Sequence, residues 1–227
     1  MDGTLIRPIA RYRGDLGEKF GVPRQAGIVE ALEGRVVFEP AYREAEALRG
    51  IEGFSHLWLI WQFSENLREE GDWSPTVRPP RLGGNVRMGV FATRSPFRPN
   101  ALGLSCVKLL GLERDPELGT VLRVGGADLM DGTPIFDVKP YIPYADAHPE
   151  ALSGFAPDAG ASLELVFPPE WEERIPPEKR EALRGVLARD PRPRYHGDPE
   201  RVYGLRFGER NIKFTVKDRV LTVREIE

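Results

Sequence analysis

The 227-residue sequence has one cysteine, Cys106, and three histidines, and this scarcity excludes several kinds of site. A lone cysteine cannot form an intramolecular disulfide, which fits a reducing compartment. No histidine stands in a zinc-ligand spacing with the cysteine, so we expect no metal site. Cys106 lies in the apolar run LGLSCVKLLGL, where we interpret it as a packed strand residue in preference to a nucleophile.

Long apolar runs are also lacking. No stretch reaches the roughly 18 apolar residues of a membrane-spanning helix, and the first residues, MDGTLIRPIAR, lack a signal-peptide core. We therefore expect a cytoplasmic protein with no membrane partner. A GxGxxG motif after a strand and a GxSxG nucleophile elbow are both missing, which disfavours a Rossmann-type nucleotide site and a hydrolase.

Negative charge is missing from the middle of the chain. Although the net charge is −3, no Asp or Glu occurs between Asp72 and Glu113. Five arginines stand in this gap, in RPPRLGGNVRMGVFATRSPFRPNALGLS at residues 78–105. Such a positive segment can hold phosphates or a carboxylate, and the alternative is an ordinary basic surface. Residues 189–224 form a second positive stretch, with ten bases and five acids.

The residues that are present favour a mainly β protein. Hydrophobic residues make up 41% of the chain, enough for a core. Many short apolar runs stand at close spacing, which favours a barrel or sandwich over a parallel βαβ sheet. We expect strands within residues 6–12, 35–38, 55–63, 86–93, 104–113, 120–129, 134–141 and 162–168, and a short helix at 41–49.

The composition changes near residues 156–172. After this point we expect a proline-opened amphipathic helix in PPEWEERIPPEKREALRGVLARD, then strands in VYGLRFG, IKFTVKD and RVLTVREI, with a tight turn at Asp218-Arg219. The predicted fold is therefore a single β-barrel with short helices plus a small C-terminal α+β appendage. We divide the chain into a barrel domain at 1–165 and a small domain at 166–227.

Five blocks of the sequence, taken together, resemble the TrmO (TsaA-like) family. They are VPRQAGIV, RGIEGFSHLWLI, GVFATRSPFRPN preceded by RPPRLGGN, DLMDGTPIFDVKPYIPYAD and DPRPRY, and they follow the family's order across nearly the whole chain. The resemblance implies a β-barrel enzyme that uses S-adenosylmethionine to methylate threonylcarbamoyladenosine beside the anticodon, at position 37 of threonine-type tRNA. It also implies a homodimer.

The resemblance carries the cofactor site over to specific positions. These are Pro23, Arg24 and Gln25, Ser64 and Glu65, Arg94, Leu104, and Met130, Asp131, Gly132 and Thr133. Two blocks depart from the family pattern. Ser64 follows Phe63 where many members have histidine, which excludes a catalytic imidazole there, and Ala101 replaces a proline.

The same blocks imply the catalytic and RNA-binding residues. Asp131 and Tyr141 are the side chains in matching motifs that can help remove the proton of a poorly nucleophilic amine. Asp131 alternatively anchors a turn or the ribose, Tyr141 stacks on the base, and His56 is structural. For the anticodon stem-loop we expect contacts from Arg78, Arg81, Arg87, Arg98, Arg192 and Arg194, some of which alternatively lie between subunits. The competing hypothesis is a non-catalytic barrel that binds RNA or a nucleotide.

Overall fold

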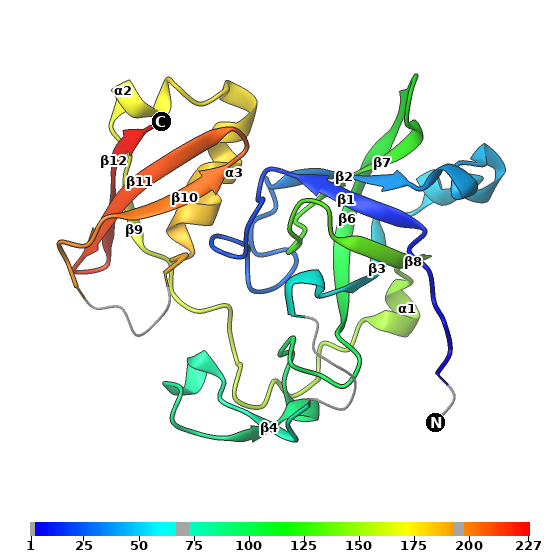
Figure 1. Ribbon diagram of the computed structural model, residues 1–227, viewed down its shortest axis with the longest axis horizontal. Coiled ribbons are helices and arrows are strands. Elements are labelled where there is room, and N and C mark those ends of the chain that lie inside the picture. The colour runs from blue at the N-terminus through cyan, green and yellow to red at the C-terminus, as the bar shows by residue number, and fades with distance from the viewer. Residues whose placement is uncertain (1–2, 67–72, 193–197) are drawn as a thin grey trace.

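The computed structural model describes residues 3–66, 73–192 and 198–227, and most of its regular structure is β (Figure 1). The mainly β class predicted from the sequence is confirmed. Six antiparallel strands form a closed barrel in the order β1-β2-β7-β6-β3-β8, in which β8 pairs back with β1. Their bounds are β1 Ala10–Gly14, β2 Glu33–Phe38, β3 His56–Gln62, β6 Leu102–Asp115, β7 Gly119–Gly125 and β8 Pro134–Pro140.

Alternation along the strands fills the barrel interior. In β3, Leu57, Leu59 and Trp61 are buried, whereas the residues between them are half-buried. This period of two follows from the pleat, which points successive side chains to opposite faces. The interior cluster continues through the inward residues of the other strands, among them Val36, Val107, Leu122 and Ile135.

The strand ends place three long connections together. β1, β3 and β7 end, and β2, β6 and β8 begin, at one end of the barrel. The connections there are residues 15–32, 63–101 and 126–133. The second contains the short strands β4 (Thr76–Val77) and β5 (Met88–Gly89), which pair with each other. It also contains 3₁₀ turns at Ser64–Asn66, Pro80–Leu82 and Val90–Ala92.

The strand expected at residues 86–93 forms only in part. Only Met88–Gly89 is extended, and Val90–Ala92 forms a 3₁₀ turn. The carbonyls that a strand would offer to a neighbour are used within the loop, because Arg98 donates to the Val90 and Thr93 carbonyl oxygens at 3.2 and 2.7 Å. The Arg98 side chain therefore takes the place of a neighbouring strand at these two carbonyls.

The helix expected at residues 41–49 forms two 3₁₀ turns instead, Pro40–Tyr42 and Ala45–Leu48, followed by a third at Ile51–Gly53. Neither of the first two has a buried residue. Since most helical stability in proteins comes from packing an apolar face, this segment lacks what a regular helix needs. The short helix α1 (Pro143–Asp146) follows β8.

The C-terminal part forms a four-stranded sheet in the order β10-β11-β12-β9 with helices beside it. Its elements are β9 Glu164–Val166, α2 Pro169–Glu172, α3 Pro177–Ala188, β10 Tyr203–Phe207, β11 Arg210–Lys217 and β12 Val220–Ile226. The expected apolar face of α3 is confirmed, since Ala182, Leu183, Val186 and Leu187 are buried. The expected Asp218-Arg219 turn is confirmed as well, with φ of 49° and 66°. The division drawn at 165/166 falls inside β9, which pairs with β12.

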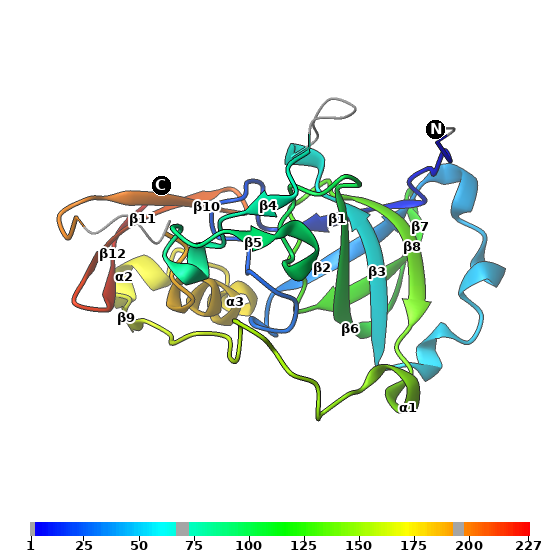
Figure 2. The ribbon, with the colours of Figure 1, turned by 90° about the horizontal axis from the view of Figure 1, so that it is seen from below.

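The connection between β1 and β2 contributes buried side chains to the C-terminal core, although it joins two strands of the barrel. Leu16, Val29 and Leu32 are buried in one cluster with the apolar residues of α3 and β10–β12. Phe20 stacks against Tyr203, with ring centroids 6.5 Å apart. Figures 1 and 2 show this connection between the barrel and α3. The two parts of the chain are therefore joined through residues 15–32.

Among the described helices, α3 is the longest at 12 residues, and none is long and apolar enough to cross a membrane.

Candidate functional site

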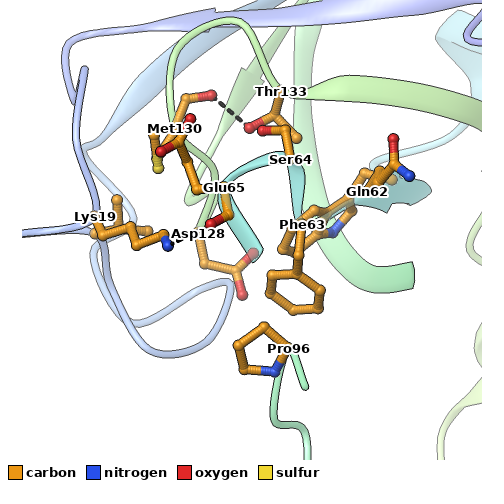
Figure 3. Close-up of a pocket in the computed structure, with 11 residues that line it drawn as sticks. Lys19, Gln62, Phe63, Ser64, Glu65, Pro96, Asp128, Met130 and Thr133 are labelled. Atoms are coloured by element: carbon orange, nitrogen blue, oxygen red, sulfur yellow. Dashed lines mark hydrogen bonds between the residues drawn. The ribbon is translucent and has the colours of Figure 1, made fainter. Parts of the chain in front are cut away.

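A cavity of about 210 Å³ opens at the end of the barrel where the three long connections meet (Figure 3). Its walls come from all three connections and from the end of β3. The lining residues are Lys19, Val22, Trp61, Gln62, Phe63, Ser64, Glu65, Pro96, Asp128, Met130 and Thr133. Indole, phenyl, proline and thioether groups supply apolar surface, while two carboxylates and an ammonium supply charge. The cavity thus combines a slot for a flat ring with sites for groups of both charge signs.

A chain of three polar groups runs from the barrel interior into this cavity. Trp61 Nε1 donates to Ser105 Oγ at 2.9 Å, and Ser105 Oγ donates to Asp128 Oδ1 at 2.5 Å. Burial raises the pKa of Asp128 above its ordinary value, while hydrogen bonds from Ser105 and the Ala26 backbone act in the opposite direction. Asp128 was not among the residues expected from the sequence. Asp128 opens the DLMDGTP block, but no role was assigned to it; in the sequence it is a single acid between Ala127 and Leu129, both of which are buried.

The connection between β7 and β8 is fastened to β1. Asp131 N donates to the Leu16 carbonyl at 2.7 Å, and Gly132 N donates to the Tyr12 carbonyl at 2.8 Å. The Asp131 carboxylate accepts from Gly14 N at 3.2 Å and from Arg13 at 3.4 Å. Its side chain therefore faces β1 and is not part of the cavity wall, in keeping with the anchoring alternative.

Two residues flanking that turn do line the cavity. Thr133 Oγ1 donates to the Met130 carbonyl at 2.8 Å, a bond visible in Figure 3. Gly132, with a φ of 78°, adopts the left-handed conformation that lets the chain reverse between them. The structure therefore brings Met130 and Thr133 together with Ser64 and Glu65, as the sequence predicts. Lys19 Nζ donates to the Glu65 carbonyl at 3.0 Å and closes one side.

The predicted VPRQ loop meets the predicted arginine next to the cavity. Arg94 donates to Gln25 Oε1, and Gln25 Nε2 donates to the Arg24 carbonyl at 2.5 Å. Pro23 is buried and Arg24 is exposed. These residues are not in the cavity wall, but their neighbour Val22 is. Two segments 69 residues apart are thus joined at the rim.

Leu104 and Tyr141 lie elsewhere. Leu104 is 56% exposed and pairs with Ile60 on the outer face of the barrel. Tyr141 follows the far end of β8, where its ring lies 5.7 Å from the Trp58 ring and 6.2 Å from the His56 ring. β8 has seven residues, about 23 Å of extended chain. Within one chain, Tyr141 is therefore at the opposite end of the barrel from the cavity.

The predicted RNA-binding arginines fall into three groups. Arg78 and Arg87 are exposed and form no ion pair with any described residue. Arg81 pairs with Asp158 at 2.6 Å, and Arg98 is bound to loop carbonyls. Arg192 donates two bonds to Asp190 and is only 14% exposed, so it serves the fold around α3. Arg194 lies outside the described residues.

Within the described residues, no cluster of three or more His, Cys, Asp or Glu side chains could hold a metal ion.

Comparisons with known proteins agree with this geometry. The family model for the tRNA-methyltransferase O N-terminal domain matches residues 12–147, and that for the TrmO C-terminal domain matches residues 160–227. An Escherichia coli tRNA (adenine(37)-N6)-methyltransferase is 42% identical over 236 residues, which covers 100% of this chain and 99% of the relative. RcsF of Pseudomonas aeruginosa, provisionally named an S-adenosylmethionine-dependent methyltransferase, is 40% identical over 215 residues, 91% of this chain and 90% of that protein. The crystal structure of TrmO from Pseudomonas aeruginosa aligns with a TM-score of 0.81 and 29% identity, over 100% of this chain and 99% of that one.

Proposed function

The chain belongs to the TrmO family, and on that premise we propose that it methylates the exocyclic amine of threonylcarbamoyladenosine at position 37 of threonine tRNA. The protein is an S-adenosylmethionine-dependent tRNA methyltransferase. The observation that carries the proposal is the end-to-end match to an Escherichia coli enzyme named for N6 of adenine 37. The threonylcarbamoyl group and the tRNA type rest on the five sequence blocks.

The cavity suits S-adenosylmethionine by the chemistry of its walls. Trp61, Phe63 and Met130 offer flat and polarisable surface for adenine, and Glu65 offers oxygens to a sulfonium or an ammonium. Arg94 beside the rim suits a carboxylate. When bound, S-adenosylmethionine supplies an electrophilic methyl carbon.

Residues of the chain orient the cofactor and keep water away. We assign cofactor contacts to Ser64, Glu65, Met130 and Thr133 in the wall and to Gln25 and Arg94 at the rim. Pro23, Arg24, Asp131 and Gly132 hold the two loops in shape, since each lies beside a residue of the wall or rim. In place of the family histidine, the Ser64 hydroxyl and backbone are available in the cavity.

Arg78 and Arg87 are the best candidates for anticodon-loop phosphates because they are exposed and lie in the acid-free segment.

We also propose a homodimer. Leu104 and Phe91 are large apolar side chains that are 56% and 71% exposed on one chain, and we assign them to the surface that a second copy covers. Leu104 and Tyr141 can contribute to a cofactor site only from such a second copy.

We propose different roles for the two family domains. We assign the barrel to cofactor binding and the C-terminal domain, beginning before β9, to tRNA or subunit contacts. Because its substrate is tRNA, we place the protein in the cytoplasm.

The test is transfer of labelled methyl groups from S-adenosylmethionine to threonine tRNA prepared with and without threonylcarbamoyl at position 37. The proposal predicts label on the modified tRNA alone. Label on neither, with cofactor binding intact, contradicts the proposed acceptor. If isothermal titration detects no cofactor binding, with or without tRNA, the chain is instead the RNA-binding barrel of the competing hypothesis.

A further inference from the structure

Asp128 is the most deeply buried of the three charged side chains that line the cavity, since Lys19 and Glu65 are exposed. It follows β7 and precedes the Met130–Thr133 turn. Figure 3 shows its carboxylate directed into the space bordered by Phe63 and Pro96. Three other acids near this end are placed differently, since Glu65 is exposed, Asp131 faces Arg13 on β1 and Asp15 pairs with Lys179 of α3.

While Asp128 is ionised, the hydrogen bonds of the Trp61–Ser105–Asp128 chain have only one possible direction. The Trp61 indole N–H can donate but not accept, so the Ser105 oxygen must accept from it. Ser105 then has one proton left, which it donates to Asp128 Oδ1. This arrangement holds Oδ1 as an acceptor and leaves Oδ2 as the oxygen that can take up a proton. A buried serine and a buried tryptophan thus orient one carboxylate toward the cavity.

The surroundings of Asp128 make it a stronger base than an ordinary aspartate. Burial is the largest influence and raises its pKa, while Ser105, the Ala26 backbone and the Arg94 charge keep the ionised form accessible. A base whose pKa lies closer to the working pH removes a proton more effectively. The other titratable or charged side chains around it are Lys19 from the β1–β2 connection, Glu65 after β3, and the buried phenol Tyr12 on β1.

Resting on the function proposed above, we infer that Asp128 is the catalytic base that accepts the proton of the methylated amine. The amine nitrogen forms a bond to the methyl carbon with its lone pair, and the bond between that carbon and sulfur breaks, leaving the electron pair on sulfur. The N–H proton passes to Asp128 Oδ2, which becomes a neutral carboxyl group. It returns the proton to water after the product leaves. Charge and atoms balance without a further reactant.

The inference assigns distinct roles to neighbours of Asp128. Ser105 and Trp61 are positioning residues, because they act only through the carboxylate. Removing the Ser105 hydroxyl takes away a hydrogen bond to the ionised form, which raises the pKa of Asp128 further. A purely structural carboxylate would give neither a kinetic pKa nor such a shift.

The experiment measures kcat against pH for the full-length enzyme on threonylcarbamoylated threonine tRNA, together with the Kd for S-adenosylmethionine. For wild type we expect kcat to fall on the acid side as one group is protonated. Asp128→Asn should bind the cofactor within a few-fold of wild type, lose about 10²- to 10⁴-fold in kcat and lose the acid limb. Asp128→Glu should restore the limb in part, and Ser105→Ala should move it to higher pH.

Asp137→Asn is the matched control, since this carboxylate of β8 is paired with Lys139 away from the cavity and should leave the profile unchanged. The inference is overturned if Asp128→Asn keeps its kcat or its acid limb. If that variant fails to fold or to bind cofactor, the Ser105→Ala profile decides, and an unshifted limb overturns the inference. Wild type that transfers no methyl group to the modified tRNA counts against the proposed function instead.

Discussion

At the scale of single residues, burial of the Asp128 carboxylate lowers the free energy of unfolding at neutral pH. A carboxyl whose pKa is higher in the folded than in the unfolded state binds protons more tightly when folded. The free energy of unfolding therefore falls as the pH rises from the ordinary aspartate pKa, about 3.9, through the raised folded value. Above that window the folded protein carries the whole cost of a buried negative charge.

Asp128→Asn should consequently be more stable than wild type at neutral pH. The amide keeps an oxygen that can accept from Ser105 and removes the buried charge. Each kcal/mol gained raises Tm by about 2–4 °C for a chain of this size. The check is a series of thermal melts from pH 3 to 8, in which the advantage should shrink toward the acid end. An advantage that grows as the pH falls would contradict the raised pKa.

Arg87 offers a second residue-scale prediction. It is exposed in the acid-free segment and donates a 3.2 Å hydrogen bond to Thr76 Oγ1. Arg87→Glu should weaken tRNA binding several-fold and lower the slope of log Kd against log salt by about one, while the cofactor Kd and Tm stay unchanged. Arg114→Glu makes the same charge change at an exposed site outside that segment and serves as the control. Equal losses in both variants would show a general charge effect and no local contact.

The sequence pointed to loop residues that line the cavity, but it did not point to the buried carboxylate of Asp128. Ser64, Glu65, Met130 and Thr133, which the sequence assigns to a cofactor site, line one cavity because the motifs that contain them flank strand ends. Asp128 gave no pattern of its own, since its environment depends on Ser105, which is 23 residues away. Tyr141 stays a prediction, because within one chain it lies beside Trp58 and His56 at the other end of β8 from the cavity.

At the scale of elements, the contact between α3 and the β1–β2 connection supports the loop that carries Val22 to the cavity wall. Gly185 packs on Val29, and a Cβ at Gly185 would lie 2.6 Å from Val29 Cγ1. Val29 is β-branched and buried, so it has little freedom to move aside. Helix and loop are therefore in closest contact at a position where only glycine fits.

Gly185→Ala should destabilise the protein, although the same change in an exposed helix usually stabilises it. Overpacking of this kind costs about 1–3 kcal/mol, and displacement of the loop should also raise the cofactor Kd. Thermal melts and calorimetric titration measure both effects. Val29→Ala in the Gly185→Ala background removes the clash and should restore part of each loss. If the double variant is simply the sum of the two singles, the clash is not the cause.

The sequence also shows at this scale where periodicity misleads. Strands of the barrel and the C-terminal sheet were predicted because alternation and turn residues act locally, as at Asp218-Arg219. The segment at 86–93 alternates in the same way but forms a turn, since Arg98 satisfies its carbonyls. The sequence of those eight residues does not indicate that the guanidinium of Arg98, which follows them, will bind the Val90 and Thr93 carbonyls.

At the scale of the whole molecule, residues 15–32 make the two domains depend on each other. Asp15 pairs with Lys179 of α3 at 2.5 Å, and Gly208 N donates to the Asp15 carbonyl at 2.7 Å. Together with Leu16 and Val29 in the shared cluster, these contacts join β1 of the barrel to the C-terminal core. The sequence predicts a division into two domains, but it does not indicate these contacts, because they link segments far apart in the chain.

The full-length protein should therefore unfold in a single cooperative transition. Fluorescence from the barrel tryptophans and far-UV circular dichroism should give one midpoint, and the calorimetric and van't Hoff enthalpies should agree. Two separated transitions would show that the shared cluster does not couple the domains.

The central claim is that this chain methylates N6 of threonylcarbamoyladenosine at position 37. The most direct measurement is mass spectrometry of the nucleosides from threonine tRNA after incubation with the protein and isotope-labelled S-adenosylmethionine. The account predicts that the labelled methyl group appears on threonylcarbamoyladenosine alone. A label on another nucleoside, or on adenosine 37 that lacks the threonylcarbamoyl group, would contradict it.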